Sequence, residues 1–155
     1  MLNKCIILVL ICFFSLTTLT ACFNQIRVGE QFVGELNTYD GVTMTVVEGT
    51  VHPGGISTDV INTTEKEIGS GNVADFRLQI ERDGKWYWLK EQGSFSITAE
   101  AYFYTQDVTV KLDLNWNDRY GSLPNGRYRI VKDFFEYHKA GYSTNFLLAT
   151  EFTLQ

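Results

Sequence analysis

Cysteine is scarce in this sequence of 155 residues and is confined to its start. The three cysteines are Cys5, Cys12 and Cys22. No thiol follows residue 22, so no disulfide can form within the remaining chain. Residues 22–155 are still long enough to bury roughly two thirds of their unfolded surface, a fraction that does not require cross-links. The sequence therefore predicts one domain that is stable without disulfides, after a separate N-terminal segment.

Basic residues are few relative to acidic ones. The chain has 13 Lys and Arg against 18 Asp and Glu, a formal net charge of −5. Domains that bind nucleic acid carry a basic face toward the phosphates, so this balance argues against a nucleic-acid partner. The same acidity gives no electrostatic attraction to anionic lipids, so any membrane attachment needs another cause.

The one long hydrophobic run lies at the N-terminus. Lys4 precedes a nearly unbroken apolar run, 5–16, which ends in Thr17 and Thr18. One positive charge followed by a short apolar run is typical of an export signal. A membrane-spanning helix needs about 20 apolar residues, and this run is shorter. We therefore expect a signal peptide over residues 1–21, with a retained membrane span as the alternative.

The end of this segment reads Leu19-Thr20-Ala21-Cys22. An ordinary secretory signal has small residues at the first and third positions before the cut, and Leu19 does not fit. The motif resembles the lipobox of bacterial lipoproteins. This resemblance implies cleavage after Ala21, a lipid on the Cys22 thiol, and anchoring on the extracytoplasmic face of the cell membrane. The alternative, that Cys22 is one more apolar signal residue, leaves a lone thiol on an exported protein.

Residues 22–40 are weakly patterned. We interpret them as the lipidated Cys22 and a flexible tether, with a short strand near Phe32 as an option. The domain is then expected over residues 41–155.

From Val42 onward, apolar and polar residues alternate with a period of two. This alternation is typical of antiparallel sheets with one buried face. Turn signals separate the runs, and Asp83-Gly84 favours a tight hairpin because both residues tolerate positive φ. No stretch has convincing helical periodicity, so the pattern predicts an all-β domain. The expected strands include residues 42–46, 56–61, 76–81, 108–114, 127–131 and 151–155.

A local motif narrows the fold class. Leu123-Pro124-Asn125-Gly126-Arg127-Tyr128 is similar to a tyrosine corner, in which the tyrosine hydroxyl bonds to backbone a few residues upstream. The chain from about Gly41 to Gln155 also resembles a family of bacterial Ig-like domains found on small exported lipoproteins. The resemblance implies an immunoglobulin-like antiparallel β-sandwich of about seven strands and no particular activity. The residues that carry it are Val42–Val47, Asn62, Asp83–Trp86, Trp116–Asp118, Tyr120–Gly121 and Gly126–Lys132.

Two segments resemble motifs for ligand binding in their residue types, but their context or spacing does not fit. Residues 69–74 match a dinucleotide fingerprint, but they follow a polar run and precede a strand, so we interpret them as a loop. The acidic and amide residues of segment 113–118 suggest a calcium loop, yet the sixth position is Asp118 and the twelfth is Pro124. We interpret these residues as a turn, in which Asn and Asp side chains bond nearby backbone groups, with a surface calcium site as the alternative.

His52 and His138 are far apart in sequence, and no catalytic constellation has assignable roles. We therefore expect no cofactor, no metal, no catalytic residue and no enzymatic activity.

Aromatic residues supply the candidate binding sites. In Trp86-Tyr87-Trp88, alternation sends the two tryptophans to one face and Tyr87 to the other. One of these faces is expected to be core, as sandwiches commonly bury a tryptophan, and the alternative is a stacking face for sugar rings. Tyr102-Phe103-Tyr104 has the same ambiguity.

Segment 133–142 is expected to be the F–G loop between the last two strands, and residues 134–139 could make one helical turn within it. Loops at the ends of a sandwich carry recognition, and aromatic residues anchor interfaces. The alternative is that these side chains fold back and cap the core. The candidate partner-binding residues are Phe134, Phe135, Tyr137 and Tyr142.

The sequence thus favours a non-enzymatic lipoprotein that binds an envelope protein or polymer. A carbohydrate-recognition module that uses Trp86, Tyr87 and Trp88 is the alternative, and an envelope hydrolase is a distant third.

Replacement of Cys22 by serine tests the anchor. Serine cannot accept the thioether-linked lipid, so Cys22→Ser should leave the precursor uncut and reduce its stable attachment through acyl chains. Membrane fractionation with gel mobility measures both effects. Normal processing and anchoring of the variant would overturn the lipoprotein hypothesis.

Overall fold

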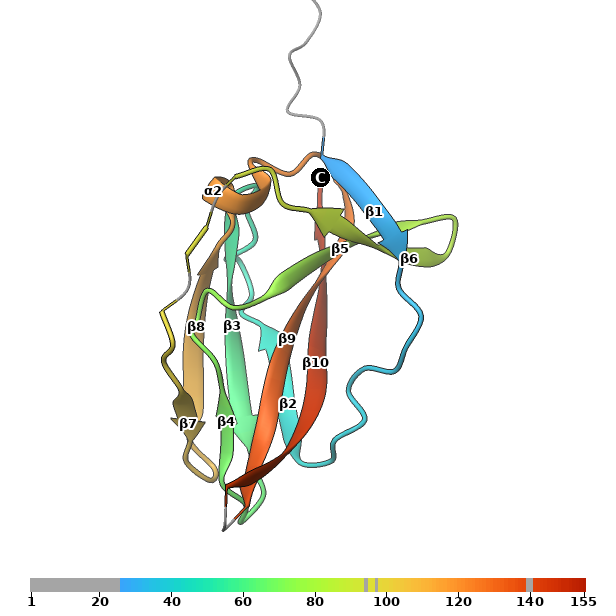
Figure 1. Cartoon of the computed structure of the whole chain (residues 1–155). Coiled ribbons are helices and arrows are strands. Elements are labelled where there is room, and N and C mark those ends of the chain that lie inside the picture. The colour runs from blue at the N-terminus through green and yellow to red at the C-terminus, as the bar shows by residue number, and fades with distance from the viewer. Residues whose placement is uncertain (1–25, 94, 97, 139–140) are drawn as a thin grey trace, which may run out of the picture.

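The structure is a computed structural model that describes residues 26–93, 95–96, 98–138 and 141–155 (Figure 1). The predicted signal peptide, Ala21 and Cys22 lie outside the described residues. The described chain is all-β, apart from the four-residue helix α2 (Asn117–Tyr120). The strands are β1 (Arg27–Gln31), β2 (Val42–Val46), β3 (Gly55–Asn62), β4 (Ile68–Ser70), β5 (Arg77–Arg82), β6 (Lys85–Lys90), β7 (Tyr102–Tyr104), β8 (Thr109–Asn115), β9 (Gly126–His138) and β10 (Tyr142–Leu154).

Two antiparallel sheets form a sandwich, so the expected fold class is confirmed. The larger sheet has seven strands in the order β1-β6-β5-β9-β4-β7, with β10 paired to β9, and the smaller sheet has the order β2-β3-β8. The estimate of about seven strands was low. The additional strands β1, β4 and β7 have only three to five residues each, too few to show an alternating pattern.

The core lies between the two sheets and consists of the inward residues of each alternating strand. Trp116 is fully buried beside helix α2, stacks on Phe152 at 5.4 Å between ring centroids, and donates its indole N–H to the Pro53 carbonyl at 2.8 Å. Phe152 also stacks on Tyr128 at 5.6 Å. Further buried side chains include Val60, Ile68, Phe76, Leu78, Leu112, Leu114, Ile130, Phe134 and Leu148.

The tyrosine corner predicted from the sequence is present. The Tyr128 hydroxyl donates a hydrogen bond of 2.8 Å to the Pro124 carbonyl, four residues upstream. A Cβ on Gly126 would lie 3.1 Å from Cε2 of the Tyr128 ring, so a glycine leaves the ring the room it needs. This bond fixes the point at which the chain enters β9.

For the described part of residues 22–40, the option of a short strand near Phe32 is correct, because β1 ends at Gln31, and the flexible tether is not found. Strand β1 pairs with β6, and the segment after it, residues 32–41, crosses to the edge of β10 before entering β2. We call residues 32–41 the strap. The Asn37 side chain exchanges two hydrogen bonds with the Ala149 backbone, at 3.1 and 2.8 Å. The Tyr39 ring stacks on Phe146 at 4.0 Å. These contacts come from single side chains and backbone groups, which leave no periodic signal in the sequence.

The two ends of the described chain lie together. The start of β1 and the C-terminus are at one end of the sandwich, and the end of β9 and the start of β10 are at the opposite end (Figure 1). We call the latter the far end. No helix in the described part of the chain is long and apolar enough to cross a membrane.

The tyrosine corner predicts a measurable loss of stability. Tyr128→Phe removes the hydroxyl and leaves the Pro124 carbonyl without its donor, which should lower the free energy of unfolding by about 1–2 kcal/mol. Tyr87→Phe is the matched control, because no bond from the Tyr87 hydroxyl is recorded among the described residues, and it should change stability little. Urea unfolding measures both, and equal losses would contradict a special role for the corner.

Candidate functional site

The expected ten-residue loop between the last two strands does not exist. Strand β9 continues to His138 and pairs with β10 in an unbroken register, from Gly126 opposite Leu154 to His138 opposite Tyr142. Only residues 139–141 connect the two strands. The prediction of a loop, and of a helical turn inside it, is therefore wrong. Two adjacent phenylalanines hid the alternation, because one of them faces the core and the other faces outward.

Phe134 belongs to the core and not to a binding surface. It is 1% exposed, and its ring lies 5.9 Å from Phe146 and 5.4 Å from Tyr104. A partner cannot reach this side chain in the folded domain. The core-capping alternative is thus correct for Phe134, and its assignment to the binding loop is corrected.

Phe135 and Tyr137 lie on the opposite, outer face of β9, two residues apart. The Phe135 ring covers Gly69 of β4, where a Cβ would lie only 2.5 Å from Cζ of the ring. This glycine lets Phe135 meet Phe103 of β7 edge to face, at 6.0 Å between centroids. Phe103 is 52% exposed and Tyr137 is 44% exposed. We call Phe103, Phe135 and Tyr137 the outer aromatic patch.

Tyr142 does not join this patch. It pairs with His138, whose side chain is on the other face of the sheet from Tyr137, and it is 74% exposed. The four aromatic residues proposed for one loop therefore divide among the core, the outer face and the inner side of the far end. Phe103, which the sequence left ambiguous, takes the place of Phe134 in the exposed group.

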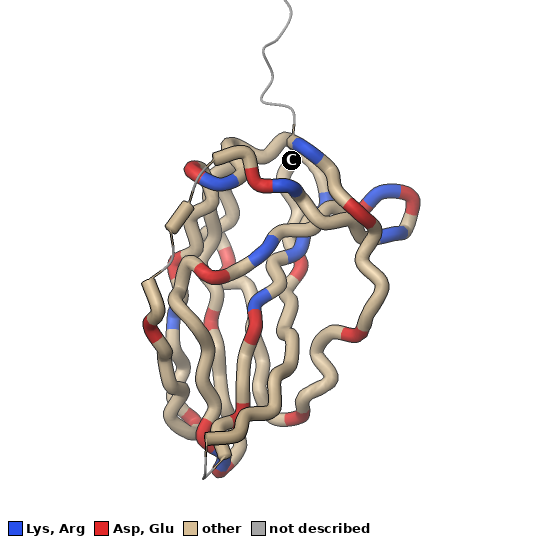
Figure 2. Tube along the Cα trace, viewed as in Figure 1, with Lys and Arg blue, Asp and Glu red and all other residues tan. Residues whose placement is uncertain are grey.

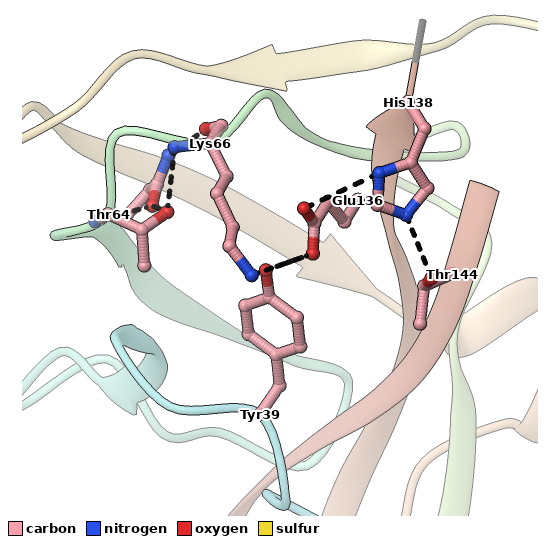
Figure 3. A network of polar contacts seen from close by, with 7 residues as sticks. Tyr39, Thr64, Lys66, Glu136, His138 and Thr144 are labelled. Atoms are coloured by element: carbon pink, nitrogen blue, oxygen red, sulfur yellow. Dashed lines mark hydrogen bonds and ion pairs between the residues drawn. The ribbon is translucent and has the colours of Figure 1, made fainter. Parts of the chain in front are cut away.

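A polar network joins the strap to the far end (Figure 3). The Tyr39 hydroxyl donates to Glu136 Oε2 at 2.7 Å, and the Lys66 ammonium contacts the same oxygen at 3.0 Å. His138 bonds Thr144 at 2.9 Å and lies near the other Glu136 oxygen. The bonds from Tyr39 and Lys66 lower the pKa of Glu136, so this carboxylate stays ionised. A carboxylate held in this way stabilises the strap and is a poor proton donor.

The Trp86-Tyr87-Trp88 strand divides as the alternation predicted. Tyr87 and Leu89 pack toward the core, and the two tryptophans face outward. Arginines cover the indole rings: Arg129 lies 4.3 Å from the centre of Trp86, and Arg77 lies 4.4 Å from that of Trp88. Lys and Arg positions gather on β5, β6 and β9 in this half of the molecule, with acidic residues among them (Figure 2).

One lysine is buried inside the sandwich. Lys132 of β9 is fully buried, and its ammonium donates to the carbonyls of Asn72 at 2.7 Å and Asp75 at 2.9 Å, and to that of Gly71 at 3.4 Å. Burial lowers its pKa to about 8. The side chain thereby fastens the loop between β4 and β5 to the central strand. All three contacts are to backbone carbonyls of that loop, which gives Lys132 a structural role.

The remaining sequence motifs have local structural explanations. Gly69 and Ser70 lie in β4 and not in a loop, which corrects that expectation. The backbone N–H of Asn117 donates to the Asn115 side chain at 3.0 Å, which is the turn chemistry proposed for that segment. Within the described residues, no three His, Cys, Asp or Glu side chains gather as metal ligands.

A family model described as a bacterial Ig-like domain matches residues 38–153 of the chain. No curated protein and no solved structure matches it.

Lys132 predicts a pH dependence of stability. Below pH 8 the folded and unfolded chains both carry the charge, so its burial opposes folding fully. As pH rises from about 8 toward the usual lysine value of 10.5, the unfolded chain holds more protons, and the free energy of unfolding should increase by about 1 kcal/mol per pH unit. This rise in the free energy of unfolding should end near pH 10. Burial raises the pKa of Tyr104 and Tyr128, so above that pH these tyrosines ionise first in the unfolded chain, which opposes folding.

Urea unfolding between pH 8 and 10 measures this slope. Lys132→Met should flatten it, and Lys85→Met, at an exposed lysine, should leave it unchanged. Identical slopes in the native chain and Lys132→Met would refute the assignment.

Proposed function

The chain belongs to the bacterial Ig-like domain family, and from this premise we propose a non-enzymatic binding module, anchored by lipid on Cys22, whose outer aromatic patch contacts a protein of the cell envelope. The observation that carries the proposal is the exposure of Phe103 and Tyr137 on paired strands, where the Phe135 ring packs against Phe103.

The patch has the properties of an interface anchor. Its three rings come from β7 and β9, which are linked through β4, so their positions are fixed by strand pairing. Side chains that are already ordered lose little conformational freedom on binding, and aromatic rings supply large contact areas.

Anchoring at Cys22 would orient this patch away from the membrane. The four residue steps from Cys22 to Ile26 reach at most about 14 Å. The end of the sandwich that holds the start of β1 and the C-terminus would therefore face the bilayer (Figure 1). Strand β9 has 13 residues and runs toward the far end for roughly 40 Å. A partner in the envelope would meet the far end first.

The distribution of ionisable groups supports a non-catalytic role. Glu136 is ionised and engaged by both Tyr39 and Lys66, and Lys132 is held by backbone carbonyls. Both groups are occupied by contacts within the domain. These contacts stabilise the fold, and they weigh against the envelope hydrolase considered from the sequence.

The carbohydrate alternative is less favoured in its original form. Tyr87 faces inward, so the three aromatic side chains of β6 do not share one surface. Arg77 and Arg129 occupy the faces of Trp88 and Trp86 on which a sugar ring would stack.

A capture experiment tests the proposal. The full chain, solubilised in mild detergent, serves as bait for envelope extract beside the double variant Phe103→Ser/Tyr137→Ser. The variant should lose the captured protein, and binding to that purified protein should weaken by at least about 2 kcal/mol, or thirtyfold in Kd.

The matched control is Val33→Ser/Tyr142→Ser, which removes two more exposed side chains from other surfaces (87% and 74% exposed). It should bind as the native chain does. Thermal unfolding checks that each variant is folded. Equal binding by folded patch and control variants would reject the patch as the partner site.

A further inference from the structure

The strap and the outer face of the larger sheet enclose a pocket of about 460 Å³ on the half of the molecule that holds β1. Its volume lies within the range of about 300–1,000 Å³ that is typical of small-molecule sites. The residues that define its chemistry are Gln31, Phe32, Lys85, Trp86, Arg129 and Glu151.

Arg129 is the central group of this pocket. Its guanidinium lies between two rings, 4.3 Å from the centre of Trp86 and 5.1 Å from that of Phe32. Its Nε donates to Oε1 of the fully buried Gln79 at 2.5 Å. The bond and the two rings fix the guanidinium plane. The terminal Nη1 and Nη2 atoms, which form no recorded bond among the described residues, remain as a paired donor edge.

Two other arginines on the outer face of this sheet are paired with carboxylates. Arg77 contacts Asp133 at 3.3 Å, and Arg127 contacts Glu151 at 2.5 Å and Glu81 at 3.4 Å. Glu151, the one acid that lines the pocket, is bonded to Arg127 and not to Arg129. Arg129 forms no salt bridge with a described residue, although it is placed and oriented as firmly as its neighbours.

A fixed guanidinium with a free Nη edge matches the two oxygens of a carboxylate or a phosphate. The other pocket walls suit a sugar. Phe32 and Trp86 present apolar ring edges, and the Gln31 amide and the Lys85 ammonium, which have no recorded partner among the described residues, can bond hydroxyl or acidic oxygens.

We infer that this pocket binds the acidic group of an anionic saccharide, with Arg129 as its bidentate receptor. This site is separate from the outer aromatic patch and does not depend on the partner proposed for it. It also differs from the stacking face considered for Trp86 and Trp88, because the guanidinium, and not the indole face, makes the principal contact.

Nuclear magnetic resonance of the full chain in detergent micelles tests the inference. The chain has three tryptophans, so three indole N–H signals are expected, and Trp86→Phe identifies that of Trp86. Glucuronic acid, glucose 6-phosphate and neutral glucose are added at constant ionic strength. An acidic sugar should shift the Trp86 signal saturably, with Kd on the order of 1 mM, and glucose should not. Whichever of the two acidic sugars binds with the lower Kd shows whether the site prefers a carboxylate or a phosphate.

Arg129→Lys keeps the positive charge but removes the paired Nη donors of the guanidinium, so it should weaken binding of the acidic sugar by about tenfold or more. Arg77→Lys is the matched control, because Arg77 also covers a tryptophan but already has a carboxylate partner, and it should bind normally. Absence of a saturable shift, or native binding by folded Arg129→Lys, would overturn the inference. Equally tight binding of acetate or inorganic phosphate alone would overturn its saccharide part.

Discussion

Strand β9 is hydrogen-bonded along both edges, and its register decides which of its side chains face the core and which face outward. One edge pairs with β10 over its whole length, and the other pairs first with β5 and then with β4. A slip of one residue would exchange its two faces. Tyr128 and Phe134 would then leave the core, and Arg129 and Phe135 would enter it. The tyrosine corner at the start of β9 and the polar network at its end hold this register at both extremities.

The sequence predicted the fold where a signal is local or periodic. Alternation located most of the long strands, and the residues around Tyr128 identified the corner. Prediction failed where structure depends on single long-range contacts. Asn37 bonds Ala149, which is 112 residues away along the chain, and no motif in the sequence around Asn37 predicts this contact. Strand β4 has only three residues, too few for a periodic signal, yet it joins β7 to β9 and places Gly69 under the Phe135 ring.

The candidate sites were less predictable than the fold, and for a physical reason. Exposed aromatic residues can be counted in the sequence, but their convergence depends on pairing between strands that are distant along the chain. Phe103 and Phe135 meet because β7 and β9 both pair with β4. The pocket around Arg129 is lined by the end of β1, the strap, β6, β9 and β10, and Gln79 of β5 holds Arg129 in place. Arg129 reaches Trp86 across the intervening strand β5, and Glu151 pairs with Arg127 and not with Arg129, which only the three-dimensional structure shows.

The arrangement of β1 also determines how the domain would carry a mechanical load. If the N-terminal side is fixed to a membrane and a partner pulls on the far end, tension enters through Arg27 and runs along β1. The antiparallel bonds between β1 and β6 lie across the strand, so they resist this pull in shear and share it. Should they yield, the Asn37 contacts with β10 form a second clamp before the sandwich itself is loaded. The N-terminal segment would then lengthen in two steps, first as β1 leaves β6 and then as the strap leaves β10. The outer aromatic patch would stay folded through both steps.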